Sequence, residues 1–277
     1  MRGRFAVGAA AWAALLAFAA PAGAQLRPLD PVAWSVFEGD HAVEAELGGA
    51  WLRGQRASLA GTQGDLWEAG NLRLSWRSGR VAVEAGGTLQ RFFHERSRFA
   101  EPDPLGDVAA APGGRRHDSG DYRIQTLVRL TPAGWSGLGV LRFGTRLPTT
   151  DNMTGLDRDA TDFFFTLGGR ARRGAAAVAG EAGLGIFGTR RPRFEQDDVL
   201  LYAASAEWTA GPLAATVGAV GQKHGAAHRQ IRGNEDLGEL RAGIRAGRRR
   251  WVRVQAVHGY ERTSPRAGVI ASVGVAR

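Results

Sequence analysis

The sequence predicts an all-β protein: a transmembrane antiparallel up-and-down β-barrel of about twelve strands. Three observations lead to this class. From residue 40 onward, segments of about ten residues alternate apolar with polar or small side chains. The breaks between them alternate between short and long. Beside the short breaks lie Trp76, Trp135, Trp208 and Trp251, and beside the long ones lie Trp51, Phe93, Tyr122, Phe143, Phe163 and Tyr260. Barrels that cross a bilayer show this alternation, with short turns on one side of the membrane and aromatic girdles at its two interfaces.

Residues 1–24 resemble a secretory signal peptide. Arg2 and Arg4 precede the apolar run 6–20, and Ala22-Gly23-Ala24 offers a cleavage site between small residues. We therefore expect residues 1–24 to be removed, residues 25–39 to form a periplasmic N-terminal segment and residues 40–277 to form the barrel. An N-terminal membrane anchor is the alternative, although the run is shorter than the roughly 20 residues of a spanning helix.

Each predicted strand separates two kinds of side chain. In the first, Val43, Leu47 and Trp51 share one face, whereas Glu44 and Glu46 share the other. Turn-forming residues then bound each segment, and the longest break, residues 94–120, is rich in Pro, Gly, Asp and Arg. The predicted strands are 43–51, 72–77, 81–90, 122–130, 135–147, 163–172, 178–186, 200–208, 213–219, 239–245, 252–260 and 267–275.

Composition narrows the candidate functions. The chain has no cysteine, which excludes disulfides and thiolate metal sites. Its formal net charge of +9 favours an anionic lipid surface or an anionic solute as partner. Export makes nucleic acid an unsuitable partner. The 40 glycines would weaken helices but suit bends in a curved sheet.

The predicted inner face carries charges of both signs. Opposite charges on neighbouring strands would pair, so the sequence allows two interpretations. In one, salt bridges fill and close the lumen; in the other, surplus arginine lines a polar pore that favours anions. The candidate lumen-lining residues are Arg123, Arg129, Arg142, Arg146, Arg170, Arg241, Arg253, Glu44, Glu84, Glu181, Glu207 and Glu239.

Two glycine- or acid-rich patterns lack the context of a ligand site. Residues 183–188 match G-x-G-x-x-G, but no helix follows to bind a nucleotide, so we interpret them as a strand. The acidic loop with Asp151, Asp157, Asp159 and Asp162 misses the spacing of a calcium loop, and Arg158 lies among its carboxylates.

Two histidine patterns are equally incomplete. His117-Asp118-Ser119 places a base near a hydroxyl, but no asparagine stands nearby to orient the histidine, as a lipid-modifying enzyme would require. His224 and His228 lie four apart in a Gly/Ala-rich loop without a third metal ligand. We therefore expect no catalytic residue, no metal site and no cofactor, and we expect the protein not to be an enzyme.

Residues 144–163 carry a family resemblance. This stretch resembles the strand-loop-strand signature G-x-K-x-P-T-G-…-G-x-G-x-x-D of an outer-membrane barrel family named for the meta-cleavage pathway of phenol degradation. Arg146 stands where the family usually has Lys, and Asp157 where Gly is common. The match covers about twenty residues. It implies a bacterial outer-membrane barrel that takes part in transport, without naming a solute.

These observations predict a monomeric barrel in the bacterial outer membrane that acts as a narrow channel or transporter for small, anionic solutes. Its expected partners are outer-membrane lipids, the barrel-assembly machinery and small solutes, with no nucleic acid. The alternative is a structural or surface barrel with a closed lumen. A lipid-modifying outer-membrane enzyme is the third interpretation.

Overall fold

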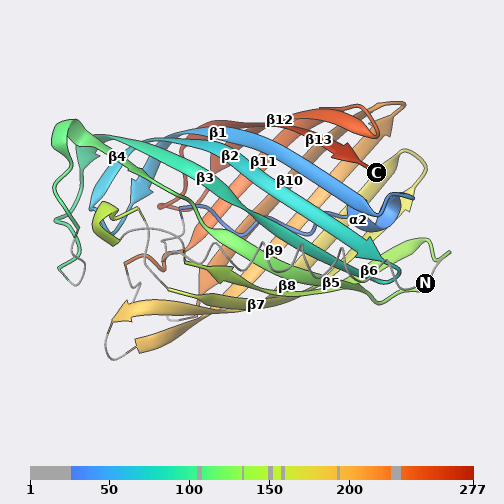
Figure 1. Ribbon diagram of the computed structural model, residues 1–277, viewed down its shortest axis with the longest axis horizontal. Coiled ribbons are helices and arrows are strands. Elements are labelled where there is room, and N and C mark those ends of the chain that lie inside the picture. Colours follow the sequence, from blue (N-terminus) through green and yellow to red (C-terminus); the bar gives the residue numbers. More distant parts are fainter. Residues whose placement is uncertain are drawn as a thin grey trace, which may run out of the picture.

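The computed structural model describes residues 26–104, 108–132, 134–148, 152–156, 160–191, 194–225 and 232–277. The predicted signal peptide, residues 1–24, lies outside this part of the chain. The strands tilt together around a common axis (Figure 1). They are β1 (Val43–Ala57), β2 (Thr62–Ser78), β3 (Val81–Arg98), β4 (Arg115–Asp118), β5 (Tyr122–Arg129), β6 (Gly137–Leu147), β7 (Asp162–Arg173), β8 (Ala176–Arg191), β9 (Phe194–Ala210), β10 (Leu213–His224), β11 (Leu237–Ala246), β12 (Arg250–Gly259) and β13 (Ala267–Ala276).

The sheet closes on itself. β1 pairs with β2 on one side and with β13 on the other, and all pairings are antiparallel. β4 and β5 both pair with β3, at different heights, so together they occupy one position of the barrel. The result is a twelve-stranded up-and-down barrel, which confirms the predicted fold class. A short helix, α2 (Ser35–Glu38), and two 3-10 turns, η1 (Pro112–Gly114) and η2 (Asn152–Thr154), complete the described elements.

The barrel is apolar outside and charged inside. Val217 and Ile244 are each about 60% exposed, while Glu84 and Arg142 are each 2% exposed. A water-soluble domain would bury the apolar side chains and expose the charged ones. A membrane barrel exposes its apolar side chains to lipid. Among the described residues no helix is long and apolar enough to span a membrane.

Several strands are longer than the sequence predicts. β2 begins at Thr62, ten residues before the predicted start. Gly70, at φ +72°, inserts an extra residue into β2 between the pairs Gly49–Ala69 and Gly48–Asn71. Beyond this bulge the alternation changes phase, because a bulge places two residues opposite one. A prediction that relies on strict alternation therefore ends the strand at the bulge, although β2 continues beyond it.

Aromatic side chains mark both ends of the barrel. Trp76, Trp135 and Trp208 are exposed beside short turns, as predicted, and Trp51 and Trp67 are exposed at the opposite end with their ring centroids 5.7 Å apart. Trp251 differs from the prediction that it joins a girdle. Its ring faces inward over Gly274, where an added Cβ would come within 2.2 Å of it.

Candidate functional site

The lumen contains part of the chain itself. Residues 26–38, here called the lumen segment, contact inward-facing side chains of β2, β5, β6, β7, β8 and β11. Figure 1 shows the blue trace of this segment running inside the barrel towards α2. We expected residues 25–39 in the periplasm. The structure instead has residues 26–38 inside the barrel, because the arginine and the carboxylates of this segment pair with opposite charges on the barrel wall.

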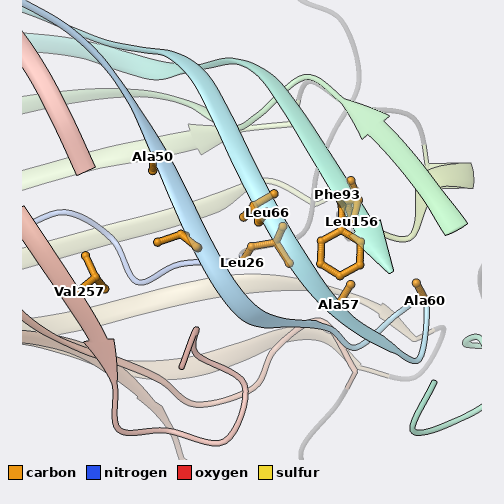
Figure 2. Packing of buried hydrophobic residues seen from close by; sticks show 9 residues of the cluster. Leu26, Ala50, Ala57, Ala60, Leu66, Phe93, Leu156 and Val257 are labelled. Atoms are coloured by element: carbon orange, nitrogen blue, oxygen red, sulfur yellow. The ribbon is translucent and has the colours of Figure 1, made fainter. Parts of the chain in front are cut away.

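The segment begins at the long-loop end of the lumen. Leu26 is 3% exposed and packs in a cluster with Leu66 of β2 and Phe93 of β3 (Figure 2). Ala57 and Ala60, beside the β1–β2 connection, belong to the same cluster. This apolar contact holds the first residue of the lumen segment against the wall.

Asp30 lies near the barrel axis. Its carboxylate is 2.8 Å from Arg241 of β11 and 3.5 Å from Arg123 of β5. Five barrel positions separate β5 from β11 in either direction around the sheet. A side chain that reaches both therefore bridges opposite walls. The Asp30 carbonyl also accepts a hydrogen bond of 2.7 Å from Arg142 of β6.

Further bonds fix the segment on both sides of Asp30. Arg27 contacts Glu239 of β11 at 3.0 Å and Glu68 of β2 at 3.2 Å. The backbone N–H of Val32 donates to Glu181 of β8 at 2.8 Å. These contacts satisfy buried charges that would otherwise be costly to leave unpaired.

The far end of the segment lies at the short-turn end. Glu38 of α2 pairs with Arg170 of β7 at 2.6 Å. Trp34 lies against Gly168, so closely that a Cβ at this glycine would come within 2.8 Å of the indole. The segment thus extends from the long-loop end to the short-turn end of the lumen.

The wall charges pair with one another as well. Glu44, Glu46 and Glu84 surround Arg73, and Arg253 contacts Glu46 from the other side. This cluster joins the first three strands to β12 around the seam where the barrel closes.

Other wall pairs continue around the lumen. Arg142 pairs with Glu181 and donates to Thr166 at 3.1 Å. Arg170 pairs with Glu207 at 2.8 Å. These contacts lie between neighbouring or next-nearest strands, as expected for an inner face of mixed charge.

Eleven of the twelve predicted lumen residues form ion pairs inside the barrel. The exception among the described residues is Arg129, which donates to the Pro132 carbonyl at 3.1 Å and forms no ion pair. Arg146, near the long-loop end, contacts Asp162 and lies with its guanidinium carbon 5.1 Å from the Phe187 ring centroid. The eleven are Arg123, Arg142, Arg146, Arg170, Arg241, Arg253, Glu44, Glu84, Glu181, Glu207 and Glu239.

A cavity of about 370 Å³ remains beside the lumen segment. On β9 and β10 its wall consists largely of small residues, among them Ala203, Ser205, Thr216 and Gly218. Small side chains leave room where larger ones would fill the interior of a barrel of this size. The lumen segment thus narrows the lumen, and space remains along β9 and β10.

The other sequence patterns have separate outcomes. Residues 183–188 lie within β8, as the strand interpretation predicted. His117 is exposed whereas Asp118 is buried, so the two face opposite sides of β4. Asp118 instead accepts a hydrogen bond from Thr154 at 2.5 Å.

The structure describes only part of the acidic loop and of the His224/His228 pattern. Asp151, Asp157, Asp159 and His228 lie outside the described residues. His224 contacts Asp197 at 2.7 Å through Nδ1. Among the residues that the structure describes, no group of three or more His, Asp or Glu side chains is arranged to hold a metal ion.

The sequence analysis missed several residues of the lumen. Glu68 and Arg91 pair at 3.2 Å, and both lie beyond the phase change at Gly70. Arg27 and Asp30 precede the first strand, where no alternation exists to read. Only the charges of the segment could have indicated its place. Residues 26–38 contain both positive and negative side chains, and so does the predicted inner face of the barrel, so the two could form ion pairs.

Comparison with known proteins identifies the fold. No protein-family model and no curated protein matches the sequence. A solved outer membrane channel from Pseudomonas putida F1 superposes with a TM-score of 0.62 at 13% identity, covering 90% of this chain and 100% of that one. This chain has the fold of the outer-membrane β-barrels. At such low identity the likeness shows the fold alone, so the family suggested by residues 144–163 stays a prediction.

Two other solved structures resemble the chain more loosely. The translocator domain of the autotransporter NalP from Neisseria meningitidis has a TM-score of 0.47 at 12% identity, covering 87% of this chain and 90% of that domain. The toluene transporter TodX from Pseudomonas putida has a TM-score of 0.44 at 10% identity, covering 92% of this chain and 96% of that one.

Proposed function

We propose that this outer-membrane barrel is a channel for small solutes, narrowed by its own lumen segment and selective for anions. The observation that carries the proposal is the position of Asp30 between Arg123 and Arg241 on opposite walls, beside a cavity that stays open. A segment held by ion pairs across the axis can limit passage without filling the lumen. The proposal includes no catalytic step, metal or cofactor.

The charge of the cavity supports the preference for anions. Nine arginines and seven carboxylates line it, so its formal charge is positive. Arginine keeps its charge at any physiological pH. In a narrow channel, rings of such side chains set the sign of the permeating ion. Paired charges weaken this field, so we expect a moderate preference rather than exclusion of cations.

We expect Arg245→Gln to reduce the preference for anions. Arg245 lines the cavity and forms no ion pair among the described residues, so its removal lowers the positive charge of the cavity without breaking a salt bridge. Reversal potentials across planar bilayers under a salt gradient measure the effect. Arg248→Gln is the matched control, because it removes the same charge from the exposed turn between β11 and β12. Cation selectivity of the unmodified barrel would contradict the proposal.

The second candidate is a structural barrel whose lumen stays closed. The ion pairs of Arg27, Asp30 and Glu38 favour it, because they tie the segment to several strands at once. Single-channel recording separates the candidates. Discrete conductance steps from the intact barrel support the channel. Absence of conductance from the intact barrel, whether or not deletion of residues 26–38 opens it, supports the closed alternative.

A further inference from the structure

Four arginines gather outside the lumen, at the long-loop end of β1 and in the connection from β12 to β13. Arg53, Arg262 and Arg266 are exposed, and Arg56 is partly exposed. The charges of Arg262 and Arg266 are close enough to act on that of Arg56. We call Arg53, Arg56, Arg262 and Arg266 the rim arginines.

Local packing brings the rim arginines together. The backbone N–H of Arg266 donates to the Arg53 carbonyl at 2.9 Å. The Arg266 side chain crosses Gly54, where an added Cβ would lie 2.9 Å from its Cγ. Gly54 has φ +69° and lies in the register shift of β1 between Leu52 and Gln55. A residue with a side chain at Gly54 would displace Arg266, so this glycine helps to form the cluster.

The rim arginines lack neutralising carboxylates. None of the four forms an ion pair among the residues that the structure describes. Nearby acids are engaged elsewhere: Asp65 binds Arg96 at 2.8 Å, and Glu261 binds Lys223 at 2.7 Å. Four like charges without counterions repel one another, which favours an anionic ligand from outside the chain.

The height of the cluster indicates where that ligand lies. Trp51 and Trp67 form the aromatic girdle at this end of the barrel. Aromatic girdles lie at the boundary between hydrocarbon and headgroups. Arg53 follows Trp51 by two residues on the same outward face, which places it ~7 Å further from the hydrocarbon. Long loops mark the outer side of such barrels, so the cluster lies at headgroup level in the outer leaflet.

We propose that the rim arginines bind the phosphate groups of an outer-leaflet glycolipid, lipopolysaccharide. Guanidinium groups bind phosphate through paired, charge-assisted hydrogen bonds. The acyl chains of the same lipid would lie along the exposed Trp51 and Trp67 below the cluster. Arg56 is already held 4.6 Å from the Phe99 ring centroid, which limits its motion in the absence of lipid. This inference requires only the outer-membrane location and not the channel function.

Native mass spectrometry of the detergent-purified barrel tests the proposal. The probe is lipid A with both phosphates, titrated against the unmodified barrel, the double variant Arg56→Gln/Arg266→Gln and the conservative variant Arg56→Lys/Arg266→Lys. We expect the Gln variant to bind more than about tenfold more weakly, because each basic side chain at such a surface contributes on the order of 1 kcal/mol. The Lys variant should retain most of the affinity. Arg173→Gln, at the opposite end of the barrel, is the matched control and should bind normally.

Two further probes identify the ligand group. Dephosphorylated lipid A should bind the unmodified barrel as weakly as lipid A binds the Gln variant, and inorganic phosphate should not displace lipid A at equal concentration. Equal affinity for both forms of lipid A, or equal loss in Arg173→Gln, would overturn the proposal. Displacement by inorganic phosphate would assign the cluster to a free anion instead. Gel mobility that changes on heating in SDS verifies that each variant is folded.

Discussion

Deletion of residues 26–38 is expected to raise the single-channel conductance of the barrel by about tenfold, because it removes the constriction from a charged pore. The deletion removes Arg27, Asp30 and Glu38, so the lumen loses one net negative charge and becomes more positive. Anion selectivity should therefore increase together with conductance. Planar-bilayer recording under a salt gradient measures both quantities in one experiment.

A deletion could also disturb folding, so a point variant provides the control. Asp30→Asn keeps the length and shape of the lumen segment but removes its ionic contacts with Arg123 and Arg241. We expect brief events of the same amplitude as the deleted channel, within a record that stays mostly at the lower conductance of the intact barrel. If the deleted barrel is folded and conducts no better than the intact one, the lumen segment does not limit passage.

Val217→Arg is expected to destabilise the barrel by about 2–4 kcal/mol, the cost of a cationic side chain on the lipid face near the midplane. Val217 is 59% exposed and faces outward in the middle of β10. Its neighbour Thr216 faces the cavity, so Thr216→Arg should leave folding nearly unchanged and alter conductance instead. Urea unfolding in lipid vesicles compares the two variants. A larger loss from Thr216→Arg would show that the register is wrong by one residue.

The sequence predicted the fold well because a membrane barrel imposes alternation on its strands. The faces of β8 to β13 are regular, and residues such as Leu200 and Ile244 are exposed as expected. The count of twelve barrel positions followed from the turns. Strand ends were less predictable, since beyond the lipid neither face of β3 must be apolar, and β4 therefore lies within a predicted loop.

The candidate site was predictable only in part. Alternation assigned Arg142 and Glu181 to the inner face, where they pair. It could not show which charges compensate each other, because pairs such as Arg27–Glu239 join residues 212 positions apart. Phe93 was expected in a girdle but is 1% exposed inside the barrel, since the alternation of β3 changes phase beside Gly70.

The position of Asp30 between opposite walls is the central claim, and cross-linking tests it most directly. The chain has no cysteine, so the double variant Asp30→Cys/Arg241→Cys introduces one unique pair of thiols. With the ion pair removed, we expect an elevated conductance that a short bis-methanethiosulfonate, which links the two thiols through disulfides, lowers again and a reductant restores. Single cysteine variants should show neither change. An unlinked product and a conductance insensitive to the reagent would contradict the claim that residues 26–38 lie across the lumen.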